Sequence, residues 1–248
     1  FSRDEDKLKE AGADLIITGR TIGALEELDD EIKASGGKAT IVELDMHDYE
    51  AIPRLAAAIN GRWGKLDGFV ANAATLGSLT PLSHLDDWVW NDTIAINLTA
   101  QWHLIKAMEP LLLAASAGRV VLVSSGVAEG IKPFWGPYAI SKAGLEAMGR
   151  VWAGETEQTN LRINILNPGG TATRMRASAF PGENPDTLPQ PEDVAPAFLA
   201  LLDPACTDHG QRFDAKDLCK KITGEELNFK YFMKYAQEKY SNIYKLKN

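Results

Sequence analysis

The chain has 248 residues, 45% of them hydrophobic, so it is long enough to bury one large core. Its formal net charge of −8 argues against nucleic acid or an anionic membrane as the main partner. No apolar run reaches the roughly 18 residues that a membrane-spanning helix needs. The N-terminal residues carry no signal-peptide hydrophobic region, so we expect a cytoplasmic protein.

The chain begins at Phe1 rather than Met, which predicts either processing or a fragment. Its two cysteines, Cys206 and Cys219, are too few for a disulfide framework and lack the spacing of a metal site. We expect both to be structural or surface thiols, and we expect no metal.

Predicted strands and helices alternate from the first apolar run onward. Residues 15–17 read as a strand buried on both faces. Thr21 offers an N-cap to an amphipathic helix that Gly36 and Gly37 end. Two further strands, at residues 39–45 and 68–73, flank a helix at 49–63.

A long helical region is predicted over residues 86–117, and Pro110 is expected to bend or break it. The remaining segments are a strand at 119–125, a helix at 138–159, a strand from Arg162, a loop at 174–189, a helix at 191–202 and a strand at 210–215. Residues 1–215 therefore form one domain. Residues 216–248 are rich in Lys and Tyr, and their spacing predicts a helical tail that serves as a surface or partner-packing appendage.

The alternation indicates βαβ units, hence an α/β fold with a Rossmann-like, doubly wound parallel sheet and helices on both faces. Ligands of such sheets bind beyond the carboxyl ends of the strands. Small and polar residues stand at those ends and predict a pocket rim there: Gly19, Arg20, Asp45, Met46, Asn72, Ala73, Ala74, Ser124, Ser125, Pro168 and Gly169.

Three side chains predict proton transfer at this rim. Tyr138 and Lys142 are four residues apart and share one helix face, and Ser125 stands thirteen residues before Tyr138 at a strand end. A hydroxyl, a phenol and an ammonium together can move a proton to or from an oxygen on carbon, which suits carbonyl reduction or alcohol oxidation. Taken singly, Tyr138 could be a core tyrosine and Ser125 a strand-end cap.

This Ser-x12-Tyr-x3-Lys set is accompanied by ANAA at 71–74, Asn97 in IAINLTA, NPGGTATR at 167–174 and the GQRFDA ending. Together these motifs resemble the classical short-chain dehydrogenase/reductase family over about residues 11–215. The resemblance implies an NAD(P)-dependent oxidoreductase that interconverts a small-molecule carbonyl and a secondary alcohol.

The resemblance also implies roles for these residues. Tyr138 is the general acid or base, Ser125 orients the substrate oxygen, Lys142 favours the phenolate and holds the nicotinamide ribose, and Asn97 anchors a water. The cofactor-binding residues it implies are Arg20, Asp45, Met46, Asn72, Ala73, Ala74, Tyr138, Lys142, Pro168, Gly169, Thr171 and Thr173. Asn97 has an alternative as an ordinary polar residue inside a helix.

Arg20 predicts the choice of cofactor. Enzymes that prefer NAD usually place an acidic residue at this strand end to bind the ribose 2′-hydroxyl. A guanidinium instead suits a 2′-phosphate, so we expect NADP(H) to be preferred over NAD(H). The alternative for Arg20 is a solvated cation near a helix start.

One departure from the family affects the cofactor site. The family begins with a strand and a glycine-rich turn, TGxxxGxG, that holds the pyrophosphate, and no such segment precedes Ala11. We therefore expect an N-terminally incomplete domain whose sheet lacks its first strand. The alternative function is a catalytically impaired, truncated chain or pseudoenzyme that acts as an interaction module.

The loop at residues 174–189 is expected to cover the substrate, and Phe134 and Trp135 could line the same pocket. Ordinary loop packing is the alternative for both. The resemblance further implies a homodimer or homotetramer packed through the helices at 86–117 and 138–159.

Overall fold

The structure is a computed structural model that describes residues 13–34, 36–130 and 132–223. The strands are β1 (Leu15–Gly19), β2 (Ala39–Glu43), β3 (Gly68–Ala71), β4 (Arg119–Val123), β5 (Arg162–Asn167) and β6 (Arg212–Asp214). The helices are α2 (Ile22–Ala34), α3 (Ala51–Trp63), α4 (Asp87–Ile94), α5 (Ala100–Ala114), α6 (Gly136–Glu155), α7 (Arg174–Ala179), α8 (Pro191–Leu202) and α9 (Ala215–Thr223).

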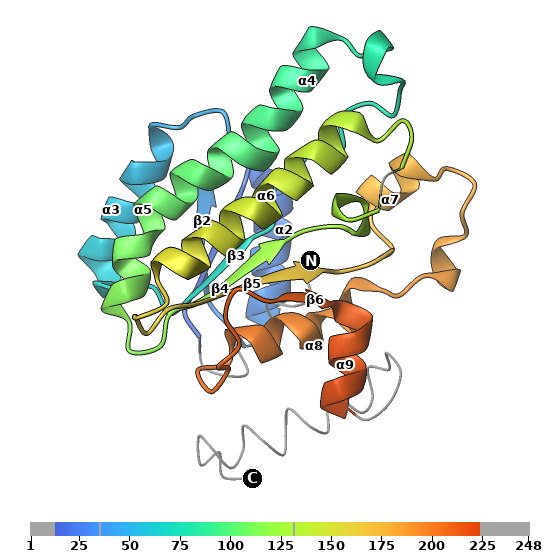
Figure 1. Cartoon of the computed structure of the whole chain (residues 1–248). Coiled ribbons are helices and arrows are strands. Elements are labelled where there is room, and N and C mark those ends of the chain that lie inside the picture. Colours follow the sequence, from blue (N-terminus) through green and yellow to red (C-terminus); the bar gives the residue numbers. More distant parts are fainter. Residues whose placement is uncertain (1–12, 35, 131, 224–248) are drawn as a thin grey trace.

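Every strand pairing is parallel. β3, β4, β5 and β6 form a four-stranded sheet in that order, and β1 pairs with β2. Helices α3, α5 and α6 cover one face of the strands, and α2 and α8 lie on the other (Figure 1). The predicted Rossmann-like α/β fold is confirmed.

The central strand β4 shows why its sequence is apolar without interruption. Val120 and Leu122 belong to the hydrophobic cluster shared with α5 and α6, whereas Val121 and Val123 belong to the cluster shared with α8 and α9. Successive side chains of a strand point to opposite faces, so a strand covered by helices on both sides needs apolar residues at every position. All five residues of β4 are buried.

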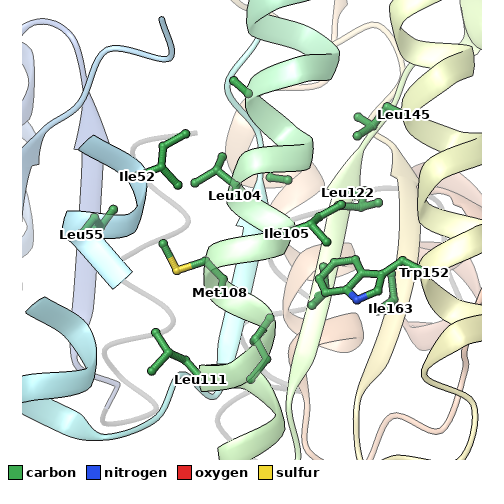
Figure 2. Packing of buried hydrophobic residues seen from close by; sticks show 14 of the residues in the cluster. Ile52, Leu55, Leu104, Ile105, Met108, Leu111, Leu122, Leu145, Trp152 and Ile163 are labelled. Carbon is green, nitrogen blue, oxygen red and sulfur yellow. The ribbon is translucent and has the colours of Figure 1, made fainter. Parts of the chain in front are cut away.

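The larger cluster is built around α5. Figure 2 shows Met108 of α5 on the side of Ile52 and Leu55 from α3, with Leu122 and Trp152 on the other side of the helix. This packing fixes α6 against the sheet through side chains that are almost fully buried. It therefore sets where the first turn of α6 stands relative to the end of β4.

The helical region at 86–117 differs from the prediction. Pro110 lies inside α5, which continues to Ala114, and Pro110 is on the exposed side of the helix. The irregularity comes earlier, at a π-helical turn over Ala95–Thr99 that separates α4 from α5. Such turns occur often at functional sites.

Two predictions concern the ends of the chain: that the sheet lacks its first strand, and that the domain ends at residue 215. Among the described residues β1 and β3 are not hydrogen-bonded to each other, and residues 1–12 lie outside that part of the chain. Helix α9 packs on α8 and buries Leu218 and Cys219. Residues 224–248 are outside the described part, so the division of the chain at residue 215 stays a prediction.

Candidate active site

The hydroxyls of Ser125 and Tyr138 meet at the carboxyl end of β4. Ser125 follows the strand with an extended backbone (φ −156°, ψ 153°), and Tyr138 stands in the first turn of α6. The two side chains are hydrogen-bonded. Burial raises the pKa of the Tyr138 phenol, and the hydrogen bond with Ser125 offsets only part of that rise. Tyr138 is thus a neutral phenol at pH 7 in the protein alone, and burial makes it a weaker acid than a free phenol.

Lys142 lies one helical turn beyond Tyr138, with Nζ 5.9 Å from the centroid of the Tyr138 ring. Its side chain is buried, and Nζ donates a hydrogen bond to the backbone oxygen of Val123 at 2.7 Å. Burial lowers the pKa of Lys142 to about 8, so the ammonium predominates at neutral pH. In the protein alone the pKa of Tyr138 stays above its ordinary value, because desolvation of the phenol outweighs its hydrogen bond with Ser125.

The buried Lys142 predicts that stability rises with pH. Its pKa is about 8 in the folded protein against an ordinary value of 10.5, so between these values the unfolded chain binds a proton that the folded protein has released. The buried ammonium therefore lowers the free energy of unfolding most at pH values below 8. This loss of stability should shrink by about 1.5 kcal/mol between pH 8 and 9.5. Urea unfolding at both pH values measures it. Lys142→Met should lack this component, and an identical rise in both proteins would contradict the prediction.

Asn97 lies within the π-helical turn, and its side chain is fully buried. Its Nδ2 donates to the backbone oxygen of Thr75 at 2.8 Å and to Oγ of Ser141 at 3.0 Å, while Oδ1 accepts from the backbone N–H of Thr75 at 2.7 Å. Ser141 in turn donates to the backbone oxygen of Tyr138 at 2.8 Å. Asn97 thereby ties the segment after β3 to the first turn of α6.

Three of the predicted cofactor residues follow the ends of β1 and β2. Arg20 is exposed, and Asp45 is exposed beside it, whereas the side chain of Met46 is buried in the core cluster. Hydrogen bonds from the backbone and ring of His47, and more weakly the charge of Arg20, hold the pKa of Asp45 below its usual range. The His47 ring lies 3.0 Å from both Asp45 and Asp92, so it joins this edge of the sheet to α4. Sequence reasoning missed His47, because a bridge to α4 has no local signature.

Asn72, Ala73 and Ala74 follow β3 as predicted, and all three are partly buried. The backbone oxygen of Ala73 accepts a hydrogen bond from Nε2 of Gln101 at 3.1 Å. Gln101 is another buried residue that sequence reasoning missed, and its Oε1 has no hydrogen-bond partner among the described residues. It holds this segment of the rim in place from α5.

The segment after β5 presents an open backbone. Gly169 has a φ of 78°, which glycine adopts without strain, and a Cβ atom there would meet no atom within 4 Å. Its N–H donates to Oδ1 of Asn167 at 3.1 Å, and Nδ2 of Asn167 is hydrogen-bonded to Asp214. A ligand could therefore approach the backbone closely at Gly169.

The two threonines of this segment already make hydrogen bonds within the protein. Thr171 is buried and donates to the backbone oxygen of Pro168 at 3.3 Å. Thr173 caps α7 by accepting from the N–H of Arg176 at 3.1 Å. Their proposed contacts with a cofactor stay predictions.

A buried ionic network lies directly beneath Ser125. The neighbouring Ser124 donates to Oε1 of Glu146 at 2.6 Å, and Nε of Arg212 donates to the same oxygen at 3.0 Å. Arg150 binds the other oxygen of Glu146 at 2.9 Å. Arg212 also pairs with the carboxylates of Glu129 and Asp214. These contacts join β4, α6 and β6, and sequence reasoning missed all of them.

The predicted substrate loop contains α7 and a short 3-10 turn at Pro185–Thr187. Its Phe180 ring lies 5.7 Å from the ring of Trp135, which lies 6.0 Å from the ring of Tyr138. Trp135 therefore stands beside the Tyr138 ring, and its place in a substrate pocket stays a prediction. Phe134 is exposed.

The donors and acceptors at the strand ends fit a nicotinamide dinucleotide at two points. The exposed Arg20 offers a cation for a ribose phosphate, and the open backbone at Gly169 follows β5, the strand that pairs with β4. The described part of the chain contains no glycine-rich turn of the kind that holds a pyrophosphate. The described residues therefore do not supply the usual contact with the pyrophosphate of the cofactor.

Within the described chain, no three His, Cys, Asp or Glu side chains gather into a possible metal site. None of the described helices combines the length and the apolar character needed to cross a membrane.

Comparison with known proteins agrees with this geometry. Residues 6–184 match the family model described as short chain dehydrogenase. The uncharacterized oxidoreductase YciK of Escherichia coli K12 is 39% identical over 209 residues, which cover 83% of this chain and 82% of that protein.

Two solved structures are also similar to this chain. A short chain dehydrogenase from Salmonella enterica serovar Typhi has a TM-score of 0.82 at 37% identity, covering 87% of this chain and 91% of that one. A short chain dehydrogenase from Escherichia coli CFT073, solved in complex with NADPH, has a TM-score of 0.81 at 38% identity and covers 87% and 92% respectively. The chain therefore belongs to the short-chain dehydrogenase family of nicotinamide-dependent oxidoreductases.

Proposed function

We propose that the protein reduces a carbonyl compound to a secondary alcohol with NADPH, and catalyses the reverse oxidation with NADP. The observation that carries this proposal is the hydrogen-bonded pair of Ser125 and Tyr138 beside the buried ammonium of Lys142. Two hydroxyls that converge in this way can both bond one substrate oxygen.

A bound nicotinamide cofactor supplies or accepts the hydride. In reduction, Ser125 holds the carbonyl oxygen, and Tyr138 donates its proton as negative charge develops there. The phenol carries its proton at neutral pH, as reduction requires, and the positive charge of Lys142 nearby would stabilise the phenolate that forms when the proton is donated. Lys142 would hold the nicotinamide ribose, and the hydrogen bonds of Asn97 keep the catalytic turn of α6 in register with the segment after β3.

The preference for NADP(H) rests on Arg20 and on one relative. Arg20 is exposed at the end of β1, where a guanidinium can bind a 2′-phosphate bidentately. The Escherichia coli CFT073 relative was solved with NADPH bound. Asp45, Asn72, Ala73, Ala74 and Gly169 are the further residues that we propose to contact the cofactor.

Titration with NADPH and NADH, followed by cofactor fluorescence, tests this proposal. We expect saturable NADPH binding in the micromolar range, whereas an absence of binding at millimolar cofactor would favour a non-catalytic interaction module. Arg20→Asp should shift the preference toward NADH by removing the phosphate partner. Lys65→Asp, before β3 at the opposite strand ends, makes the same change of charge and should leave the preference unaltered.

We also propose a homodimer or homotetramer that packs through α4, α5 and α6. These helices expose large apolar side chains, with Trp88 70%, Trp102 49% and Val151 60% accessible. Light scattering coupled to size-exclusion chromatography should report a multiple of the 27.0 kDa chain, and a monomer at micromolar concentration would contradict the assembly.

A further inference from the structure

A strained turn precedes the catalytic helix. The N–H of Trp135 donates to the backbone oxygen of Lys132, which closes a turn with Pro133 and Phe134 at its two central positions. Phe134 has a φ of 74°, the left-handed value that a type II turn needs at its third residue and normally obtains from glycine. Strained non-glycine residues of this kind cluster at functional sites. Here the turn holds Lys132 next to Trp135.

The Lys132 ammonium lies over two aromatic rings. Its Nζ is 5.7 Å from the centroid of the Trp135 ring and 5.9 Å from that of Phe180. We call these two rings the aromatic wall. Trp135 is three residues before Tyr138 and Lys142 is four residues after it, so the wall and the ribose-binding lysine flank the phenol in opposite directions along α6. If Lys142 holds the nicotinamide ribose as proposed, the wall lies at the opposite end of the phenol, where a substrate has room to approach.

The two cations at this wall differ in their partners. Arg176 lies 3.9 Å over the Phe180 ring, and its Nε and Nη2 donate to the two carboxylate oxygens of Glu183, at 2.6 and 2.7 Å. Its charge is thereby neutralised. Lys132 is exposed, and no carboxylate in the described part of the chain lies within 4.0 Å of it. In a chain of net charge −8, an ammonium left unpaired beside the catalytic phenol suits a negatively charged ligand.

We propose that the substrate is a planar, aromatic or conjugated carbonyl compound that carries a carboxylate. Its flat body would stack on the aromatic wall, because aromatic rings prefer offset or edge-on contact with other rings. Its carboxylate would pair with Lys132, while its carbonyl oxygen reaches Ser125 and Tyr138. This inference rests on the proposed function, since Tyr138 defines where the reacting carbonyl lies.

A matched pair of ketones tests the inference. 4-Acetylbenzoate and 4-acetylbenzamide share size and planarity and differ in charge. With the full chain and saturating NADPH at low ionic strength, kcat/KM should favour the acid about fivefold, the upper range for one exposed ion pair. Added salt should erode the preference. Lys132→Gln should bring the ratio close to one, and Lys132→Arg should restore it.

Lys106→Gln is the control, because Nζ of Lys106 lies 5.6 Å from the Trp102 ring on α5, a similar contact away from the site. It should keep the wild-type ratio. Equal kcat/KM for the two ketones, or a preference that survives Lys132→Gln, overturns the inference. If neither ketone is reduced, tryptophan fluorescence gives the dissociation constant of each ketone. The ratio of these two constants should then favour the acid and lose that preference in Lys132→Gln. Failure of the proposed function is distinct, because it appears as absent NADPH binding.

Discussion

Tyr138→Phe should lower kcat for carbonyl reduction by a factor of about 10² to 10⁴, the usual contribution of a positioned general acid. The substitution keeps the ring that packs beside Trp135 and removes only the hydroxyl that is bonded to Ser125. Because the proton is transferred in the transition state, kcat and kcat/KM should fall together. Steady-state kinetics with NADPH measure both values.

Two controls separate this loss from a structural effect. The dissociation constant for NADPH should stay close to the wild-type value in Tyr138→Phe, because the ring and Lys142 remain. Tyr49→Phe removes the hydroxyl of a different tyrosine, one that stacks on His103 in the core layer, and should leave kcat within about twofold. A Tyr138→Phe enzyme with near wild-type turnover would remove Tyr138 from the mechanism.

Arg212→Met should destabilise the protein by about 3 kcal/mol, since it leaves a buried carboxylate without its buried partner. The Glu146 side chain is 4% exposed and that of Arg212 is 10% exposed. Of the two cations that bind Glu146, Arg150 is half exposed and compensates only in part. Chemical denaturation at pH 7 gives the free energy of unfolding.

Lys65→Met supplies the comparison, because it removes an ion pair with Asp67 in which both side chains are about half exposed. Its free energy of unfolding should change by less than about 0.5 kcal/mol. The mutation of Arg212 should also weaken catalysis, because Ser124 and Ser125 are adjacent and Ser124 is bonded to Glu146. Equal stability losses in the two variants would show that the buried network is not specially stabilising.

The fold could be read from the residues because its signals are local. The apolar run of β4 marks a strand covered on both faces, and Gly36 with Gly37 marks the end of α2. Tyr138 and Lys142 share a face of α6 through the helical period. Ser125 follows β4, and parallel strands bring their carboxyl ends to one edge. For these reasons the positions of the proton-transfer residues were predictable.

The features that were missed or misjudged depend on contacts between distant segments. Pro110 was expected to disturb its helix, but the cost of a proline depends on whether water reaches the carbonyl left without a donor. Asn97, in the π-helical turn, is hydrogen-bonded to Thr75 and Ser141, which are 22 and 44 residues away. The Glu146–Arg212 pair spans 66 residues.

Residue order alone was enough to place Ser125, Tyr138 and Lys142, because strand and helix periods act over a few residues. The family came from the resemblance of the ordered motifs. The pKa values of Tyr138 and Lys142 could be argued only from the tertiary structure. Packing of α6 against β4 buries Tyr138 and Lys142 together, which raises the pKa of the phenol and lowers that of the amine to about 8. Desolvation depends on what surrounds a group in space, and most of those surroundings come from other parts of the chain.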